Sequence, residues 1–337
     1  MTVVDVDATR PDAELIARAA EILRRGGLVA FPTETVYGLG ANALDASAVA
    51  KIFEAKARPA WNPVIAHVAN MADAHALTTA WPDDATKLGN AFWPGPLTIV
   101  LPRHNIVPDI VSAGLPAVAV RVPSHPVARA LIAAAGFPIA APSANRFTEL
   151  SPTTAAHVAA GLGNRVELIL NGGSSDVGIE STVVDLTGAE PVILRPGVIG
   201  RDQIAAVLGR PVSIAAERVA EDTPRLSPGM VERHYAPRAD VWLFDSAHFG
   251  EVQASASQRA ARGAEGAMAA LVLDWSHEFP GDVRVIPMPN DPLAYARALY
   301  ATLHELDTTG HAVVAIERPP ASDAWAGIHD RLTRAAH

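Results

Sequence analysis

The chain has 337 residues, which is long for one domain and comfortable for two. Hydrophobic residues make up 49% and charged residues 19%, as in a globular protein with a large core, and no apolar run reaches the length of a membrane span. The absence of cysteine excludes disulfides and a cysteine nucleophile, and the net charge of −9 argues against broad, nonspecific nucleic-acid binding.

The first part of the chain alternates between helical and strand patterns. The N-terminus, MTVVDVDATRPDAEL, is too acidic for a signal peptide, so a cytoplasmic location is expected. Pro11 and an apolar stripe predict a helix over residues 11–24, and the short strand LVAF follows two glycines. A second helix is predicted from an Asp45 cap to just before Pro59. Further strands are predicted in PVIAHVA, PLTIVL, AVAVRVP, FPIAAPS, VELILNGG and STVVDLT.

This alternation predicts an α/β layer structure over residues 1–208. Residues 209–238 are rich in Pro, Arg and Glu without a sustained period, which is typical of an interdomain linker. Residues 239–337 are predicted to form a small C-terminal α/β domain, with strands in DVWLFD, AALVLD, VRVIP and HAVVAIE, a long helix ending near Gly310 and a terminal helix in WAGIHDRLTRAA. No charged cluster marks a site in this second domain.

Gly38, Gly40 and Ala43 have the G-x-G-x-x-A spacing of a dinucleotide-binding turn. In such a turn the strand runs directly into the first glycine, but here the predicted strand ends at Pro32. The following strand also carries His67 where a ribose-binding acidic residue is expected. We therefore expect these glycines to serve a turn between strand and helix.

Two short segments carry candidate ligand-binding groups. Pro59 favours an extended Arg58, so that Lys56 and Arg58 would project together from a helix end. Complementing the helix dipole is the more common use of such cations, and these residues alone favour it. In APSANR, Ser143 and Asn145 would point one way after a strand and could cradle a polyphosphate, although an ordinary Asx or Ser turn also fits.

Single polar residues also stand inside apolar strands. Arg121 lies in the centre of AVAVRVP, and a buried arginine needs an anionic partner. His67 has the pattern of a satisfied core histidine more often than that of a ligand. Thr33, Glu34 and Thr35 follow a strand end, where α/β proteins build their sites, but they could equally satisfy a loop backbone.

Together these segments resemble the threonylcarbamoyl-AMP synthases, enzymes built on a YrdC-like domain. The resemblance rests on PTETVYGLGANA, on KAR and SAN as the family's K-x-R and S-x-N, and on NPVIAHV, GIESTVVD and ILRPG. It implies a YrdC-like twisted open sheet with helices, followed by a linker and a smaller Rossmann-like α/β domain. SPGMVERHYAP resembles the interdomain segment of the family's long form, which passes over the mouth of the active site.

The resemblance implies a nucleotidyltransferase that converts L-threonine, bicarbonate and ATP, with Mg²⁺, into threonylcarbamoyl-AMP and pyrophosphate. The product serves threonylcarbamoyladenosine modification of tRNA, with a possible hand-off to a separate transferase. Neither membrane association nor stable nucleic-acid binding is expected.

The resemblance also implies roles for individual residues. The expected catalytic group is Lys56, Arg58, Ser143 and Asn145. ATP would be bound by Arg58, Asn62, Ala117, Ser143, Ser151, Arg195 and Tyr235. Threonine would be bound by Thr35, His67, Arg121, Ala141 and Ser181.

Three alternatives remain open from the sequence. The chain could be an RNA-binding module in tRNA or ribosome maturation, although 5% aromatic residues supply few stacking platforms. It could also be another carbamoyl-group enzyme on the same domain, because fold does not fix function. Within the linker, Gly229 and Tyr235 could form a lid over the nucleotide or belong to a passive tether.

Overall fold

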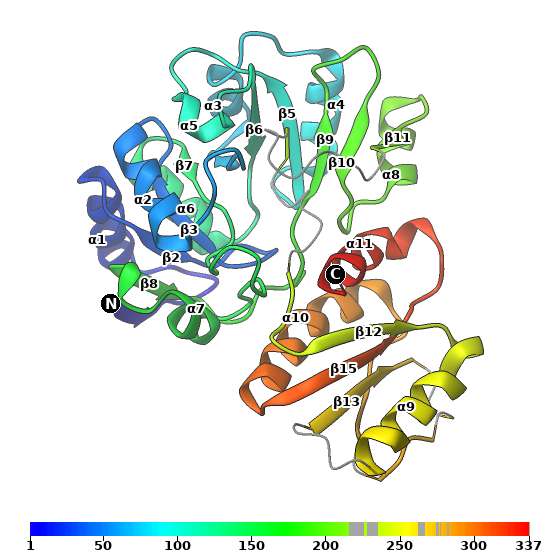
Figure 1. Ribbon diagram of the computed structural model, residues 1–337. Coiled ribbons are helices and arrows are strands. Elements are labelled where there is room, and N and C mark those ends of the chain that lie inside the picture. The colour runs from blue at the N-terminus through cyan, green and yellow to red at the C-terminus, as the bar shows by residue number, and fades with distance from the viewer. Residues whose placement is uncertain are drawn as a thin grey trace.

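The computed structural model describes residues 1–215, 226–227, 235–261, 267–273, 276, 278–281 and 283–336. These residues form two β-sheets with helices packed against them (Figure 1). The mixed α/β class predicted from the sequence is confirmed. Most of the predicted linker, including Gly229, lies outside the described residues.

The first sheet is mixed and carries the N-terminal part of the chain. It contains both parallel and antiparallel strand pairs. In spatial order its strands are β1 (Thr2–Asp5), β8 (Leu168–Asn171), β2 (Val29–Phe31), β3 (Gly38–Asn42), β7 (Ile139–Ala140), β4 (Ala66–His67), β6 (Ala117–Arg121), β5 (Leu97–Pro102), β9 (Thr182–Asp185), β10 (Val192–Arg195) and β11 (Ser213–Ile214).

The helices of this part begin at side-chain caps that the sequence supplies. The Asp12 carboxylate accepts from two amides of the first helix, and the predicted Asp45 cap does the same for the second. The helices are α1 (Ala13–Arg24), α2 (Ala46–Lys56), α3 (Met71–Ala76), α4 (Asp83–Phe92), α5 (Asp109–Ser112), α6 (Pro126–Ala135), α7 (Ala155–Leu162) and α8 (Arg201–Leu208). A 3₁₀ turn, Gly163–Arg165, follows α7.

The prediction of a turn at GLGANA is wrong, because Gly38–Asn42 forms strand β3. A Cβ on Gly40 would lie 2.7 Å from the Phe31 ring and 2.9 Å from the Ile139 side chain, so glycine is needed here for close packing. The chain turns earlier, between β2 and β3, and this loop presents Thr33, Glu34 and Thr35. The glycines are therefore not at a strand-to-helix junction, and the dinucleotide spacing is coincidental.

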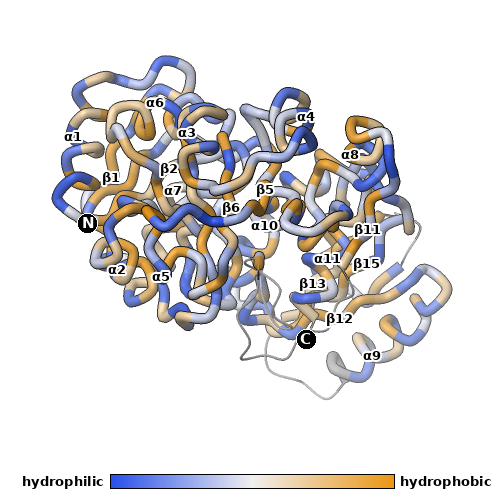
Figure 2. Tube along the Cα trace, turned by 90° about the horizontal axis from the view of Figure 1, so that it is seen from above, coloured by the Kyte–Doolittle hydropathy of each residue, from blue (hydrophilic) through white to orange (hydrophobic). Residues whose placement is uncertain are grey.

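The second sheet is entirely parallel, in the order β12 (Asp240–Phe244), β15 (His311–Glu317), β13 (Ala267–Val272) and β14 (Val283–Pro287). Helix α9 (Phe249–Ala261) covers one face of it, and Figure 2 shows hydrophilic and hydrophobic residues alternating along this helix. Helices α10 (Pro292–Thr308) and α11 (Ala326–Ala335) cover the other face. The 3₁₀ turns Ser246–His248 and Asp323–Trp325 precede α9 and α11.

Helices α10 and α11 also face the first part of the chain (Figure 1). Their apolar cluster includes Val36, Leu150 and Ile179 from the first part, so one core is shared by the two. A Cβ on Gly178 would lie 2.5 Å from the Ala296 carbonyl of α10, which shows how closely the backbones approach. Within the described residues, no helix is long and apolar enough to cross a membrane.

Candidate active site

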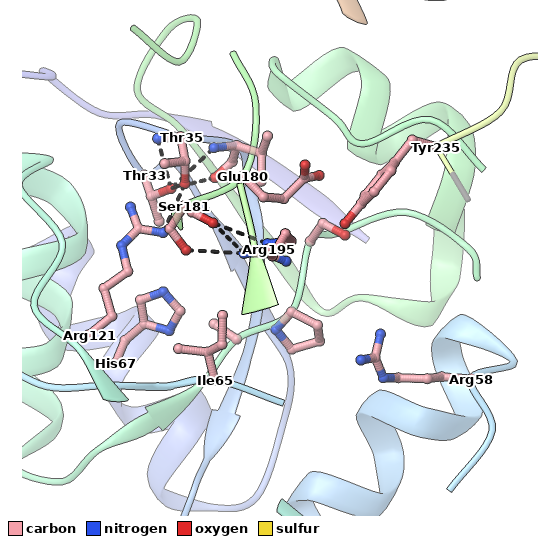
Figure 3. A pocket seen from close by; sticks show the side chains of 15 residues that line it. Thr33, Thr35, Arg58, Ile65, His67, Arg121, Glu180, Ser181, Arg195 and Tyr235 are labelled. Atoms are coloured by element: carbon pink, nitrogen blue, oxygen red, sulfur yellow. Dashed lines mark hydrogen bonds between the residues drawn. The ribbon is translucent and has the colours of Figure 1, made fainter. Parts of the chain in front are cut away.

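A polar pocket opens where several strands of the first sheet end (Figure 3). Its walls come from the β2–β3 loop, the segments after α2 and β7, β4, β6, the segment just before β9, the end of β10 and Tyr235. Nine of the residues expected to bind ATP or threonine line this pocket. They are Thr35, Arg58, His67, Arg121, Ala141, Ser143, Ser181, Arg195 and Tyr235.

Arg121 finds its anionic partner within the chain. Its Nη2 donates to Glu34 Oε1 over 2.6 Å, its Nη1 to Thr35 Oγ1 over 3.0 Å, and its Nε to the Gly95 carbonyl over 3.2 Å. Glu34 also accepts from the Ser124 amide, so its carboxylate is anchored at both oxygens. A guanidinium has five N–H donors, and within the described part of the chain Arg121 uses three of them, which leaves two for a ligand in the pocket that it lines.

His67 is paired with Arg121 in the register of β4 and β6. Burial, helped by the adjacent Arg121 charge, lowers the pKa of His67 to about 3, so the ring is neutral at physiological pH. Its Nδ1 is buried and has no hydrogen-bond partner within the described residues. The ring lines the pocket (Figure 3) and is therefore not the satisfied core histidine that its sequence context favours.

Arg58 lies on the other side of the pocket from Arg121 in Figure 3. It is 7% exposed, and its guanidinium donates to Asn62 Oδ1 and to the carbonyls of Asn62 and Pro63. All three acceptors are neutral, and among the described residues Arg58 forms no salt bridge. Burial lowers the pKa of Arg58 to about 9, and the Arg195 charge acts in the same direction. An anion at this position would offset the cost of burying the guanidinium.

Lys56 and Arg58 do not project together as predicted. Helix α2 ends at Lys56, and Ala57 adopts a left-handed conformation with φ of 51°, which redirects the chain between the two cations. Lys56 Nζ donates to the Ser143 carbonyl over 2.5 Å and to the Asn145 carbonyl. Burial first, and then the Arg58 charge, lower the pKa of Lys56 well below its usual value.

Ser143 and Asn145 do not point the same way either. Ser143 lines the pocket, whereas the Asn145 amide donates to the carbonyls of Arg146 and Glu149, on the side of a neighbouring groove. Lys56 thus ties down the backbone on both sides of Ala144, and only Ser143 reaches the cavity. The alternation expected for an extended strand fails because the segment beyond Ser143 is a loop held by this ammonium.

Arg195 ends β10 and donates through Nε and Nη2 to the Ser181 carbonyl, over 3.0 and 2.9 Å, and through Nη2 to Ser181 Oγ over 3.1 Å. Ser181 Oγ also lies 2.8 Å from Thr98 Oγ1. Tyr235 is 1% exposed and has φ of 61°, and Figure 3 shows its hydroxyl end pointing into the pocket. Burial raises the pKa of Tyr235, so the hydroxyl stays protonated.

Five expected site residues do not line the pocket. Ser151 is fully buried behind it and donates to Glu180 Oε1, and Asn62 accepts from Arg58. Ala117 pairs with Pro102 in the sheet and packs in a small apolar cluster. The five are Lys56, Asn62, Ala117, Asn145 and Ser151.

Sequence reasoning missed Glu180, Arg331 and Tyr300. Glu180 precedes Ser181 in the pocket wall and bonds to Arg331 of α11 and Tyr300 of α10. The only sequence signal was a glutamate just before an apolar strand, whereas Arg331 lies in an ordinary amphipathic helix. The expectation that the second domain carries no charged cluster is wrong, because Asp330, Arg331 and Arg334 form one at its face toward the first part.

Known proteins resemble the chain over its full length. A family described as telomere recombination matches residues 21–197, and the C-terminal domain family of threonylcarbamoyl-AMP synthase matches residues 199–337. Threonylcarbamoyl-AMP synthase of Pyrococcus abyssi is 40% identical over 337 residues, covering 100% of this chain and 98% of that protein. The Schizosaccharomyces pombe enzyme is 38% identical, covering 95% of this chain and 88% of its own.

The fold agrees with a solved relative. The crystal structure of P. abyssi Sua5 complexed with L-threonine matches with a TM-score of 0.92 at 38% identity, covering 100% of this chain and 98% of that one. Both the sequence and the two-part architecture are thus shared with these enzymes. The chain belongs to the threonylcarbamoyl-AMP synthase family.

Proposed function

We propose that this protein is an L-threonylcarbamoyladenylate synthase. It would convert L-threonine, bicarbonate and ATP into threonylcarbamoyl-AMP and pyrophosphate, as a nucleotidyltransferase acting in threonylcarbamoyladenosine modification of tRNA. The family relationship supports the reaction as a whole. The observation that supports nucleotide chemistry in this pocket is Arg58, a buried guanidinium with only neutral partners among the described residues.

The ATP side of the pocket would be built around Arg58 and Arg195. Both are buried, and the Arg195 charge further lowers the pKa of Arg58, an effect that an anion between the two would offset. A phosphate group matches the donor fork of arginine and would remove this repulsion. Ser143 and Tyr235 would add hydroxyl donors from the same cavity.

The threonine side would be built around Arg121, Thr35 and His67. The spare N–H groups of Arg121 would take the amino-acid carboxylate while Glu34 keeps the guanidinium in place. Neutral His67 offers Nδ1 as acceptor or donor without adding charge. A related protein, P. abyssi Sua5, has been crystallised with L-threonine. Ser181 and the backbone of Ala141 would complete this side.

The proposed chemistry requires positioning rather than a covalent enzyme intermediate. The threonine amine and bicarbonate form an N-carboxy intermediate with loss of water. A carboxylate oxygen of that intermediate attacks the α-phosphorus of ATP, the bond to the β-phosphate oxygen breaks, and pyrophosphate leaves. Fixed cations stabilise the charge that develops in such a transfer, which fits a pocket rich in arginine.

The remaining expected residues would act from behind the pocket wall. Lys56 would hold the backbone of Ser143 and Asn145, and Asn62 would orient Arg58. Ser151 would act through Glu180, to which it donates a hydrogen bond. Asn145 and the backbone of Ala117 do not line the pocket, so they would contact ATP from outside it.

Mg²⁺ would arrive with ATP. Within the described residues no group of three His, Cys, Asp or Glu side chains could hold a metal. The pocket carboxylate Glu180 and the neighbouring Glu34 are each paired with an arginine. The ion would therefore be held by the phosphates of the nucleotide rather than by a carboxylate cluster among these residues. We further propose that the protein is cytoplasmic. Its two domains would span residues 1–208 and 239–337, with a linker between them. The product would be delivered to a separate tRNA transferase.

Pyrophosphate release from ATP and Mg²⁺ tests the proposal. Release that requires both threonine and bicarbonate is expected, because the nucleophile forms only from the two together. Release without either would indicate plain nucleotide hydrolysis. Carbamoyl phosphate hydrolysis without threonine would favour another carbamoyl-group enzyme, and tRNA binding without ATP chemistry would favour an RNA-binding module.

A further inference from the structure

One fully buried charge links the second part of the chain to the pocket wall. Arg331 of α11 is 1% exposed, and its Nε donates to Glu180 Oε2 over 2.7 Å. Glu180 itself lines the pocket, and its carboxylate also accepts from Ser151 and from Tyr300, the latter over 3.2 Å. Both carboxylate oxygens are thus fixed by groups that lie behind the wall.

Arg331 also holds the backbone of the wall. Its Nη1 donates to the Pro196 carbonyl over 3.1 Å, and its Nη2 to the Glu180 carbonyl over 3.3 Å. Pro196 follows Arg195 and Glu180 precedes Ser181, so each bond fixes the neighbour of a pocket residue. Arg195 in turn donates to the Ser181 carbonyl, which closes a chain of contacts from α11 to the cavity.

The same guanidinium supports Tyr235 from behind. Its central carbon lies 5.0 Å from the centre of the Tyr235 ring, within the range of a cation–π contact. The Tyr235 and Tyr300 rings are 6.1 Å apart. Tyr235 is therefore packed against residues of both α10 and α11 while its hydroxyl end faces the pocket.

The position of α11 is fixed by backbone contact. A Cβ on Gly327 would lie 2.8 Å from the backbone of Gly197, two residues after Arg195. Asp323, just before α11, accepts from the amides of Arg201 and Asp202 and so caps α8 of the first part. Because Gly200 has no side chain to cap this helix, the second part of the chain supplies the cap.

We infer that Arg331 is a positioning residue contributed by the second part of the chain, which fixes Ser181, Arg195 and Tyr235 for catalysis. This inference rests on the proposed function. Arg331 does not line this pocket and acts on it through the wall. It gives the C-terminal domain a role that the composition of that domain does not reveal.

Removing the Arg331 charge should alter how Glu180 titrates. Burial acts to raise the pKa of Glu180, but Arg331 and Arg195 outweigh it and hold the pKa below its usual value. Without Arg331, the raising effect of burial would dominate and the pKa of the Glu180 carboxyl would rise. Among the described residues, the charged and titratable groups that interact with Glu180 are Lys56, Arg195, Tyr235, Tyr300 and Arg331, and Asp330 is paired with Arg331 behind them.

The test compares full-length Arg331→Met and Arg331→Lys with the wild type in threonine-dependent pyrophosphate release. Methionine has a similar volume to arginine but no charge, whereas lysine keeps the positive charge but lacks the planar guanidinium with its fixed donor directions. We expect Arg331→Met to lower kcat by about 100-fold with much smaller changes in KM, because a small shift of the groups that hold the two substrates misaligns the reacting atoms for attack. Its activity should rise with pH as Glu180 ionises, whereas Arg331→Lys should be impaired without that pH dependence.

Two further variants control for folding and for loss of an interdomain contact. Glu180→Gln combined with Arg331→Met removes both charges, so it should fold and should lack the pH dependence. Arg297→Gln removes an exposed pair with Asp176 between the same two parts and should retain wild-type activity.

A folded Arg331→Met protein with wild-type kcat and pH profile would overturn the inference alone. Identical pH profiles for the methionine and lysine variants would also overturn it. A wild type without threonine-dependent release would overturn the proposed function and the inference with it.

Discussion

Three buried arginines differ in whether they have an acidic partner within the protein. Arg121 is paired with Glu34, and Arg331 is paired with Glu180 and Asp330. Arg58, by contrast, has only neutral oxygen atoms as partners among the described residues. A buried cation that the fold leaves without a counter-ion is expensive to maintain, and such residues are concentrated at functional sites.

Replacing Arg58 with alanine should therefore reduce activity without unfolding the protein. Loss of a cation aimed at the reacting phosphates costs roughly 100-fold or more in kcat. The free energy of unfolding should change little or rise, because burial already disfavours this charge. Turnover and thermal unfolding of Arg58→Ala, beside the exposed control Arg165→Ala, provide the measurement. Full activity in the folded variant would remove Arg58 from the site.

Arg121→Lys should weaken threonine binding selectively. An ammonium cannot donate to Glu34, Thr35 and the Gly95 carbonyl in the fixed directions of the guanidinium fork. Calorimetric titration should show a threonine affinity lower by about tenfold or more, which is the scale of losing one charge-assisted hydrogen bond. ATP affinity of the same protein serves as the internal control. Unchanged threonine binding would contradict the assignment.

At the scale of elements, helix and strand limits that depend on neighbouring residues could be predicted from the sequence. Those that depend on tertiary contacts could not. The Asp45 cap and the end of α2 before Pro59 were predicted because capping and proline act within a few residues. Strand β1 and helix α9 were missed, since β1 is a short, exposed edge strand and α9 has a mixed pattern. The turn at Gly38 and Gly40 was wrong because the need for glycine comes from Phe31 and Ile139, which are close only in the fold.

The same limit applies to the candidate site. The strand ends that carry Thr35, His67, Arg121 and Arg195 could be anticipated, and the structure brings these residues to one pocket. The pairing of Glu180 with Arg331 joins residues 151 positions apart and could not be read from spacing. Nor could the different directions of Ser143 and Asn145, which depend on Lys56.

Gly40→Ala tests the interpretation of β3. A methyl group would press on the Phe31 ring and on Ile139, so the variant should lose about 1–3 kcal/mol of stability. Gly161→Ala in α7 is the matched control, because a Cβ there meets nothing within 4 Å and alanine favours a helix by roughly 0.5–1 kcal/mol. Urea unfolding of both proteins would decide, and equal stability of Gly40→Ala and the wild type would contradict the packing argument.

At the scale of the whole molecule, the two parts form one unit through buried and stacked contacts. His157 of α7 and His304 of α10 are stacked, with ring centres 3.8 Å apart and planes 18° from parallel. Burial first, and then the neighbouring His304, lower the pKa of His157 to about 4. Burial likewise lowers the pKa of His304. Both rings are neutral in the folded protein at physiological pH.

These shifts predict a loss of stability in mild acid. His67 and His157 have folded pKa values of about 3 and about 4, below their usual value of 6.5, so the unfolded chain binds more protons than the folded one. Their contribution is complete above pH 6.5 and is lost as the pH falls toward about 4 for His157 and about 3 for His67. Thermal unfolding across this range should show it, and His157→Asn, which cannot titrate, should reduce the slope. An unchanged slope in that variant would contradict the assignment.

The central claim is that this pocket joins the carbon of bicarbonate to threonine and transfers the adenylyl group of ATP to the resulting carboxylate. The most direct measurement is mass spectrometry of the product formed from ATP, Mg²⁺, threonine and isotopically labelled bicarbonate. The account predicts an AMP adduct that contains threonine and carries the label, together with pyrophosphate. An adduct without the label, or AMP and pyrophosphate with no adduct, would contradict it.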